Sequence, residues 1–373
     1  MRTLKFLLQK EFKQIFRNPA ILRVIFMVPI LQLIIVPMAA DYEVKNVNVV
    51  VADHDHSIYS QQLIQKISAS KYFKLVDYTN SYQQAIKYIE SDKADVVLEI
   101  PQSFEKDIVK DDESDLFLSV NAVNGMKANI GAAYLQYIIQ DFNQFVRLKF
   151  VQVPKIPPQS VIETTYTNRF NPLMNYKVFM TPSVLVVLLT LVGAFLTALN
   201  IVREKEIGTI EQINVTPIKK HHFILGKLIP FWVLGLAVLT IGLIIVRFVY
   251  NIHPVGNILV LYVFAGIYLL AVLGLGLLVS TFADTQQQAM LISFFLMMIF
   301  ILLGGLFTPI DSMPGWIKNV TWWINPVSYF IEVVRMVVLK GSGLSDIKNH
   351  IFIMLAFAAV LNSLAVLSYR KRS

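Results

Sequence analysis

Six long runs of apolar residues constrain this chain more than any other feature of its sequence. A helix needs about 20 apolar residues to cross the roughly 30 Å hydrocarbon core of a bilayer. Each run has about that length and contains no Asp or Glu; the runs are Ala20–Ala40, Phe179–Leu199, Leu228–Tyr250, Ile258–Ser280, Ala289–Thr308 and Asn349–Ser368. The composition agrees, because 55% hydrophobic with 16% charged residues lies outside the range of soluble globular proteins. We therefore predict an α-helical integral membrane protein with six transmembrane helices.

The first run, residues 20–40, is predicted to be an uncleaved transmembrane anchor. It is too long for a signal peptide, contains Pro29 and Pro37, and has no clear small-residue cleavage site before Asp41. The chain contains no Cys, so disulfides, thiolate metal ligands and lipidated Cys are excluded.

The distribution of Lys and Arg predicts the orientation, because short segments rich in these residues stay in the cytoplasm. Residues 1–19 and residues 200–227 each contain five Lys or Arg, and the chain ends in Arg370, Lys371 and Arg372. With six spans, both termini and residues 200–227 are expected in the cytoplasm. Residues 41–178 and 309–348 are then expected outside.

The segment 41–178 is predicted to be an inserted extracytoplasmic α/β domain with a return arm. It carries 14 Lys and Arg against 17 Asp and Glu, so the net charge of +8 reflects orientation, and no nucleic-acid partner is expected. β-rich runs at Val47–Ala52, Phe73–Val76, Ala94–Ile100 and Leu116–Val120 alternate with helical patterns near Ser57–Ala69, Ser81–Ser91, Pro101–Lys110 and Met126–Lys149. This alternation favours a small, partly parallel sheet. Three Pro in Val151–Ser160 predict an extended arm leading back to the membrane.

Two further segments border the spans. In residues 1–19, apolar residues at helical spacing among basic ones predict an amphipathic helix on the cytoplasmic membrane surface. A basic flank that only orients the first span is the alternative. Residues 309–348 are rich in Trp, Pro and apolar residues, which predicts short helices at the outer interface. Trp316, Trp322 and Trp323 fit an aromatic belt as well as a substrate contact.

Two classes of function receive little support from these residues. Ion-coupled secondary transporters usually place acidic or His residues inside their spans, whereas the charged residues in these spans are Arg23 and Arg247, near span ends. A membrane-anchored enzyme or sensor would act through the outer domain, where Ala52–Ser60 holds Asp and His residues. His54 and His56 could bind a metal, but Asp and Ser between a strand and a helix favour turn formation and capping.

A third class, the membrane half of an ATP-driven transporter, is indicated by a charged stretch. The chain has no G-x-x-x-x-G-K-[ST] phosphate-binding loop, so it cannot bind the nucleotide by that motif and a partner must do so. "REKEIGTIEQINVTPIKK", Arg203–Lys220, interrupts the apolar second half of the chain and can contact such a partner. Arg203–Ile213 is compatible with a helix that Thr216 and Pro217 would end. An ordinary cytoplasmic linker is the alternative, although a linker requires no Gly-Thr pair or acidic residues.

Several motifs together resemble ABC-2 type transporter permeases of bacteria. The stretch Arg203–Ile218 is similar to the signature segment of that family. "LQKEFKQIFRNPAIL" resembles its N-terminal connecting helix and "ILGKLIPFWVLG" its third span. "GGLFTPIDSMPGWI" and "INPVSYFIEVVRMVVLKG" resemble its outer segment. These pieces follow the family's order along the whole chain, and the large outer domain between spans 1 and 2 is similar to one exporter subgroup.

The resemblance implies a permease in the bacterial cytoplasmic (inner) membrane and not an enzyme. It pairs with a second permease copy or paralogue and two copies of an ABC ATPase, which bind ATP and Mg²⁺; this chain itself needs no cofactor or metal. Some members of the subgroup also use a periplasmic adaptor and an outer-membrane channel. Substrate-binding residues remain unknown.

The resemblance also assigns residues. Those matching the ATPase-coupling motif are Arg203, Glu204, Lys205, Glu206, Ile207, Gly208, Thr209 and Glu211, and those matching the outer segment are Asn325, Pro326 and Glu332. Ile207 departs from the pattern, since relatives often have a charged residue there. If the acids contact the ATPase, charge reversal at Glu204 and Glu211 is expected to uncouple transport without affecting membrane insertion.

Overall fold

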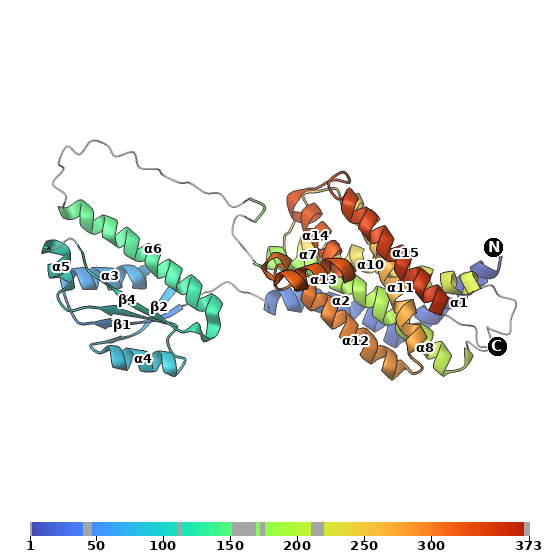
Figure 1. Ribbon diagram of the computed structural model, residues 1–373, viewed down its shortest axis with the longest axis horizontal. Coiled ribbons are helices and arrows are strands. Elements are labelled where there is room, and N and C mark those ends of the chain that lie inside the picture. Colours follow the sequence, from blue (N-terminus) through green and yellow to red (C-terminus); the bar gives the residue numbers. More distant parts are fainter. Residues whose placement is uncertain are drawn as a thin grey trace. The chain divides into compact units, whose positions relative to one another are not determined.

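The computed structural model describes residues 2–39, 47–110, 113–150, 169–171, 176–209 and 220–368. These residues divide into two compact units (Figure 1). One contains residues 47–150, and the other contains the residues before and after this insertion. Each unit has its own hydrophobic core.

The inserted unit is a four-stranded sheet with helices on both faces (Figure 1). Its elements are β1 (Val47–Asp53), α3 (Ile58–Ala69), β2 (Phe73–Thr79), α4 (Tyr82–Glu90), β3 (Val96–Ile100), α5 (Phe104–Lys110), β4 (Phe117–Val120) and α6 (Gly125–Phe150). The strand order is β2-β1-β3-β4. β1 is parallel to β2 and β3, and β4 is antiparallel to β3. The alternation in the sequence therefore predicted a partly parallel sheet correctly.

Alternate residues of the central strand β1 fill two different cores. Val49 and Val51 pack under α3 and α6 with Leu63 and Leu135. Val50 and Ala52, on the opposite face of the strand, pack against α4. A strand that is buried on both faces reads as a continuous apolar run, which is how Val47–Ala52 appears in the sequence.

In the larger unit, the described residues include six helices long and apolar enough to cross a membrane. Its elements are α1 (Arg2–Arg17), α2 (Pro19–Ala39), α7 (Tyr176–Thr190), the π-helical turns η2 (Leu191–Leu196), α8 (Thr197–Glu206), α10 (Lys220–Phe248), α11 (Ile258–Phe282), α12 (Gln286–Leu303), the 3₁₀ turn η3 (Ile310–Ser312), α13 (Gly315–Ile324), α14 (Pro326–Arg335), the π-helical turns η4 (Met336–Lys340) and α15 (Lys348–Ser368). α7, η2 and α8 form one continuous helical segment of 31 residues. It extends to Glu206, beyond the predicted end at Leu199.

α11 forms the centre of this unit, packing against α15, α10, α8, α14 and η2. Tyr268 and Phe264 of α11 are fully buried, and both rings contact Phe330 of α14. Gly276 lets α11 approach the π-helical turns, because a Cβ atom there would lie 2.5 Å from the carbonyl oxygen of Ala194. Small residues permit such close backbone approach between helices in a membrane.

Two prolines lie within the first apolar helix, and another side chain replaces the hydrogen-bond donor that one of them lacks. Pro37 has no N–H, so it cannot donate to the carbonyl oxygen of Leu33 one turn earlier. The hydroxyl of Tyr250 shares its one proton between that oxygen, at 3.0 Å, and the oxygen of Ile34, at 2.8 Å. A side chain beyond the end of α10 thus satisfies the backbone of α2.

The predicted outer segment divides into one exposed and one buried helix. In α13, Trp316 and Trp323 are largely exposed, as expected for an interfacial helix. α14 instead lies in the core, where Val327, Phe330 and Val334 are fully buried. The apolar residues of α14 pack against α7 and α11, and the position of residues 309–348 at the outer interface stays a prediction.

Candidate functional site

The residues that match the coupling motif lie at the end of α8 and in the turn that follows. We name Arg203–Thr209 the coupling segment. α8 ends at Glu206, because Gly208 adopts a left-handed conformation with φ of 82°. The N–H groups of Ile207 and Gly208 donate to the carbonyl oxygens of Arg203 and Lys205, both at 3.1 Å. This is the usual termination of a helix by Gly, and it satisfies the last carbonyl groups.

The predicted helix Arg203–Ile213 is therefore wrong as a continuous helix. Glycine adopts positive φ at little cost, so the chain turns at Gly208. The Thr209 hydroxyl then donates to the carbonyl oxygen of Glu204 at 3.1 Å. Glu211, together with Thr216 and Pro217, lies outside the described residues.

One side of the coupling segment is exposed and contacts the turn between α11 and α12. Ile207 is 63% exposed, which is high for an Ile. Lys205 donates to the carbonyl oxygen of Ala283 at 2.9 Å and pairs with Asp284. Glu206 accepts a hydrogen bond from the side chain of Gln286 at 2.7 Å. A protein that docks here would therefore contact the ends of three spanning helices.

The other side of the segment is buried in a group of charged residues. Lys227 of α10 donates to Glu11 of α1 at 2.8 Å and to Asn200 at 3.1 Å, and it forms an ion pair with Glu204 of α8 at 2.8 Å. Lys10 of α1 also bonds to Glu204, at 2.8 Å, and to Glu11, at 3.1 Å. We name these five residues the ion cluster. It joins three helices that are up to 216 positions apart in the sequence.

The ion cluster is electrically balanced, with two lysines between two glutamates. The side chains of Glu11, Glu204 and Lys227 are 3%, 4% and 2% exposed, whereas that of Lys10 is 43% exposed. Partial burial alone would lower the pKa of Lys10. However, its hydrogen bond to Glu204 and the charges of both glutamates hold that pKa above its ordinary value. A buried charge is tolerated when it is paired in this way.

Sequence reasoning missed three members of this cluster and misplaced one. In the sequence, Lys10 and Lys227 belong to the orienting charges, with Lys227 in the cytoplasmic segment 200–227, and no pattern singles out Glu11 or Asn200 as a buried pairing partner. Lys227 instead lies within α10. A usable signal is the position of Glu11, which falls between Leu8 and Ile15 on the apolar stripe of α1. Glu204 is corrected from an exposed docking acid to a buried ion-pair partner.

The outer-segment residues form a helix start and a side-chain contact between α14 and α15. Asn325 caps α14 by accepting from the N–H of Val327 at 3.0 Å, and Pro326 occupies the first helical turn, where it is well tolerated. Asn325 also donates to the carbonyl oxygen of Phe300 at 2.8 Å, which joins α14 to α12. Glu332 pairs with His350 of α15 at 3.1 Å.

The acidic residues of Ala52–Ser60 act mainly as turn and cap residues, as the sequence indicates. Asp53 is buried and accepts four hydrogen bonds, from the backbone of Asp55 and His56 and the hydroxyls of Ser60 and Tyr78. Burial alone would raise the pKa of Asp53, but these bonds hold it below its ordinary value. Ser57 caps α3 by accepting from the N–H of Ser60.

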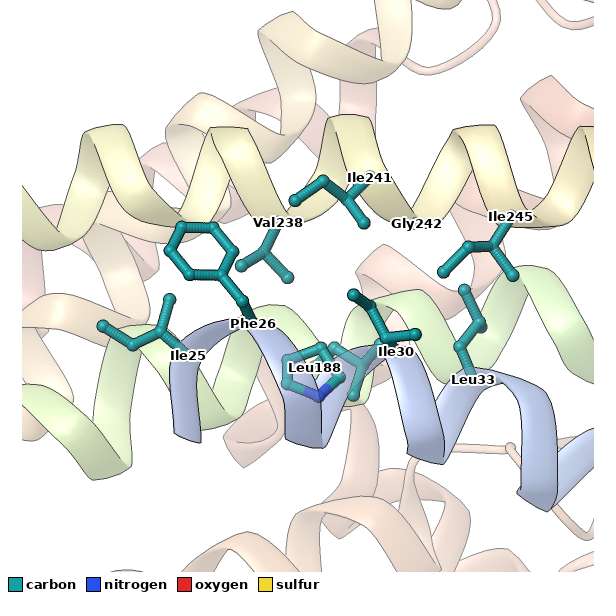
Figure 2. A pocket seen from close by; sticks show the side chains of 10 residues that line it. Ile25, Phe26, Ile30, Leu33, Leu188, Val238, Ile241, Gly242 and Ile245 are labelled. Atoms are coloured by element: carbon teal, nitrogen blue, oxygen red, sulfur yellow. The ribbon is translucent and has the colours of Figure 1, made fainter. Parts of the chain in front are cut away.

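A crevice between α2, α7 and α10 is too small to be a drug-sized binding site. Figure 2 shows the side chains that line it, including Phe26 and Ile30 of α2 and Val238 of α10. Its lining is apolar and its volume is about 10 Å³, whereas pockets for drug-sized ligands hold roughly 300–1,000 Å³. The substrate-binding residues thus stay unassigned.

Comparison with known proteins connects this geometry to a family. Residues 20–367 match the family described as ABC-2 family transporter protein. The chain is 30% identical over 366 residues to the probable multidrug ABC transporter permease YbhR of Escherichia coli strain K12, an alignment that covers 98% of both chains. It is 25% identical over 374 residues to the probable multidrug ABC transporter permease YbhS of the same strain, covering 100% of this chain and 97% of the relative. A similarity of 24% over 178 residues covers 48% of this chain and 45% of the linearmycin resistance permease protein LnrN of Bacillus subtilis strain 168.

Proposed function

The chain belongs to the ABC-2 family of transporter permeases, and from this membership we propose that it forms the membrane path of an ATP-driven exporter. Substrate leaves the cytoplasm or the inner leaflet of the membrane. A separate ABC ATPase subunit binds ATP and Mg²⁺ and hydrolyses the nucleotide. This chain is the transport subunit and carries no ATPase activity.

The observation that carries the proposal is the end of α8. An exposed Ile207 beside the polar side chains of Lys205 and Glu206 offers an apolar anchor with a charged rim, which is a common composition for a protein-docking site. Behind it, the helix is anchored to α1 and α10 by the ion cluster. A displacement of this end by a partner can therefore reach the spanning helices.

The complete transporter is proposed to contain two permease chains and two ATPase subunits in the bacterial inner membrane. The second permease chain is a copy of this one or a paralogue. Both termini and the coupling segment face the cytoplasm, and the inserted α/β unit lies outside. That unit is also the part available to a periplasmic adaptor linked to an outer-membrane channel.

The proposed substrates are amphipathic, drug-like compounds. Two relatives are named multidrug transporter permeases, and a third is named for resistance to linearmycin. Spans rich in Leu, Ile, Val and Phe suit apolar cargo better than strongly charged cargo.

Co-purification and a transport assay test the proposal together. A tagged chain is isolated from membranes of its native host, and an ATPase subunit is expected to co-elute in mild detergent. Inverted vesicles that contain both chains should accumulate ethidium when ATP is added outside, and the purified permease alone should hydrolyse no ATP.

Two outcomes would favour the other classes of function. Uptake that persists without nucleotide and collapses when the proton gradient is dissipated would indicate an ion-coupled secondary transporter. Absence of any ATPase partner and of any transport would favour an enzyme or sensor that acts through the outer unit.

A further inference from the structure

We propose that the ion cluster is a clamp that holds α1 against α10 and the end of α8, so that these three helices move as one body during transport. Lys10, Glu11, Asn200 and Lys227 are then positioning residues for the coupling segment. The inference rests on the proposed function, because it concerns how a movement imposed by the ATPase is transmitted.

The connectivity of the cluster supports a rigid clamp. Lys227 meets three acceptors from two other helices, namely Glu11, Asn200 and Glu204. Its ammonium group, with three N–H donors, therefore lies within 3.1 Å of all three acceptors. Lys10 bridges the same two glutamates from the solvent side. Each glutamate is therefore held by both lysines, so a shift of any one of the three helices breaks at least two contacts of the cluster.

The surrounding packing confines α1 in the same way. Ile15 is fully buried, and α1 lies along α10. A Cβ atom added at Gly226 of α10 would lie 3.2 Å from the Cβ atom of Leu7. A helix that served only as a surface anchor would present its apolar stripe to lipid, whereas α1 places an acid in that stripe and presents the acid to Lys227.

The clamp lies directly behind the exposed contacts of the coupling segment. Glu204 belongs to the clamp, while the next residue, Lys205, bonds to Ala283 and Asp284 at the turn between α11 and α12. The end of α8 is thus held by α1 and α10 on one side and by the α11–α12 turn on the other. Without the contacts of α1, Lys227 alone would hold the end of α8 to α10 within this cluster.

The test removes one lysine and one acid together, so that the cluster stays neutral. The variant Lys10→Gln with Glu11→Gln leaves the Lys227–Glu204 pair in place and releases α1. We expect normal membrane abundance and normal ATPase co-purification, with ATP-dependent ethidium transport reduced roughly tenfold, within the usual range of coupling between sites. ATP hydrolysis by the complex should persist, so the ratio of transport to hydrolysis falls. Lys13→Gln, on the exposed face of α1, is the matched control and should keep that ratio.

A disulfide then replaces the clamp. Because the chain has no Cys, Leu7→Cys with Gly226→Cys introduces one defined pair, and the Cβ separation of 3.2 Å has to widen by only a few tenths of an ångström to reach the roughly 3.5–4.5 Å of a disulfide. Oxidation should restore coupled transport to the Lys10→Gln, Glu11→Gln variant, and reduction should abolish it again. The same disulfide in the otherwise unchanged protein should leave transport unaltered.

Three results would overturn the clamp: normal coupling in the neutral variant, failure of the disulfide to restore transport, or loss of transport when the disulfide forms in the unchanged protein. The last result would mean that α1 and α10 must separate. If the unchanged protein shows no ATP-dependent transport, the proposed function fails. The clamp is then tested by the yield of the disulfide between the Leu7→Cys and Gly226→Cys positions in membranes. That yield should be lower in the Lys10→Gln, Glu11→Gln background.

Discussion

Glu204 and Glu206 lie two residues apart on α8 and occupy opposite environments. The side chain of Glu204 is 4% exposed and bonds to two lysines, whereas Glu206 is exposed and accepts from Gln286. Both match the coupling motif in the sequence, yet only Glu206 can reach a partner protein. We therefore predict different roles for them, a buried support and a surface contact.

Charge reversal should distinguish these two glutamates. Glu204→Lys would place a third ammonium group against Lys10 and Lys227, and breaking a buried ion pair costs about 3–5 kcal/mol. Glu206→Lys, the matched control, should change the free energy of unfolding by about 0.5 kcal/mol or less, as surface substitutions usually do. The measurements are membrane abundance and the midpoint of thermal unfolding in detergent. Equal stability of the two variants would contradict the buried position of Glu204. If Glu204→Lys also reached the membrane at normal abundance, the sequence-based expectation that charge reversal leaves membrane insertion unaffected would hold.

Asp53 is a buried acid that stabilises the inserted unit, as we expect Glu204 to stabilise the spanning unit. Asp53→Asn removes a carboxylate that accepts four hydrogen bonds, which should cost about 1–3 kcal/mol. Because its folded pKa lies below the ordinary value, this stabilisation is present above the ordinary Asp pKa of about 3.9 and is lost as the pH falls through the lower folded pKa.

Hydrogen exchange of β1 in the full chain measures this effect. Near neutral pH, Asp53→Asn should exchange faster than the unchanged protein, and the difference should shrink below the ordinary Asp pKa. Glu90→Gln, at an exposed position on α4, should match the unchanged protein at both pH values. A difference between Asp53→Asn and the unchanged protein that persists at low pH would show that the carboxylate charge is not the cause.

At the scale of elements, helices in this protein depend on side chains from other helices. The carbonyl oxygen of Leu33 in α2, left without its usual donor by Pro37, receives the hydroxyl of Tyr250. Asn325 joins the start of α14 to the end of α12 through the carbonyl oxygen of Phe300. In a membrane, an unpaired backbone group has no water to bond to, so such contacts are strongly favoured.

A double-mutant cycle tests the contact between Tyr250 and α2. Tyr250→Phe should cost about 1–3 kcal/mol, because it leaves a carbonyl group unpaired. Pro37→Ala restores an N–H that can donate to Leu33, so Tyr250→Phe should cost less in that background, with a coupling of about 0.5 kcal/mol or more. Thermal unfolding in detergent gives these values.

Tyr262→Phe is the control for this cycle, since the Tyr262 hydroxyl contacts the side chain of Thr240 instead. Its effect should add to that of Pro37→Ala. If the effects of Tyr250→Phe and Pro37→Ala were also strictly additive, the Tyr250 hydroxyl would not be compensating for the N–H that Pro37 lacks.

At the scale of the whole molecule, the chain combines a spanning unit with an inserted α/β unit. The insertion lies between the first and second spans, and its sheet forms from contiguous residues, so it adds to the spanning unit without interrupting a helix. The spanning unit has a dense core around α11, whereas α2, α12 and α15 expose most of their apolar surface within one chain. Lipid or a second permease chain would cover those helices.

Protease protection tests the orientation of the whole chain. A protease added outside spheroplasts should cleave within residues 41–178 and leave residues 200–227 intact, because the latter are rich in Lys and Arg. Permeabilised spheroplasts are the control and should be cleaved in both regions. Cleavage in residues 200–227 of intact spheroplasts would reverse the predicted topology.

Much of this architecture could be predicted from local sequence patterns. Apolar runs of spanning length placed the six helices, because an uninterrupted apolar stretch has few alternatives to a spanning or buried helix. Strand and helix periodicity likewise identified β1 to β4 and the helices between them, since each pattern is set by neighbours a few residues apart. The turn residues Asp53 and Ser57 could be recognised for the same reason.

The tertiary structure alone decided which charged residues are buried and with whom they pair. Glu11, Glu204 and Lys227 are far apart in the sequence, and no local pattern pairs them with one another. Their burial depends on α1, α8 and α10 meeting at one place. The burial of α14 also depends on long-range packing. Local sequence thus determined which segments become helices and strands, because hydrophobic periodicity is a property of neighbouring residues. Packing determined the ion cluster, because the cost of burying a charge is met only when a partner from another helix arrives.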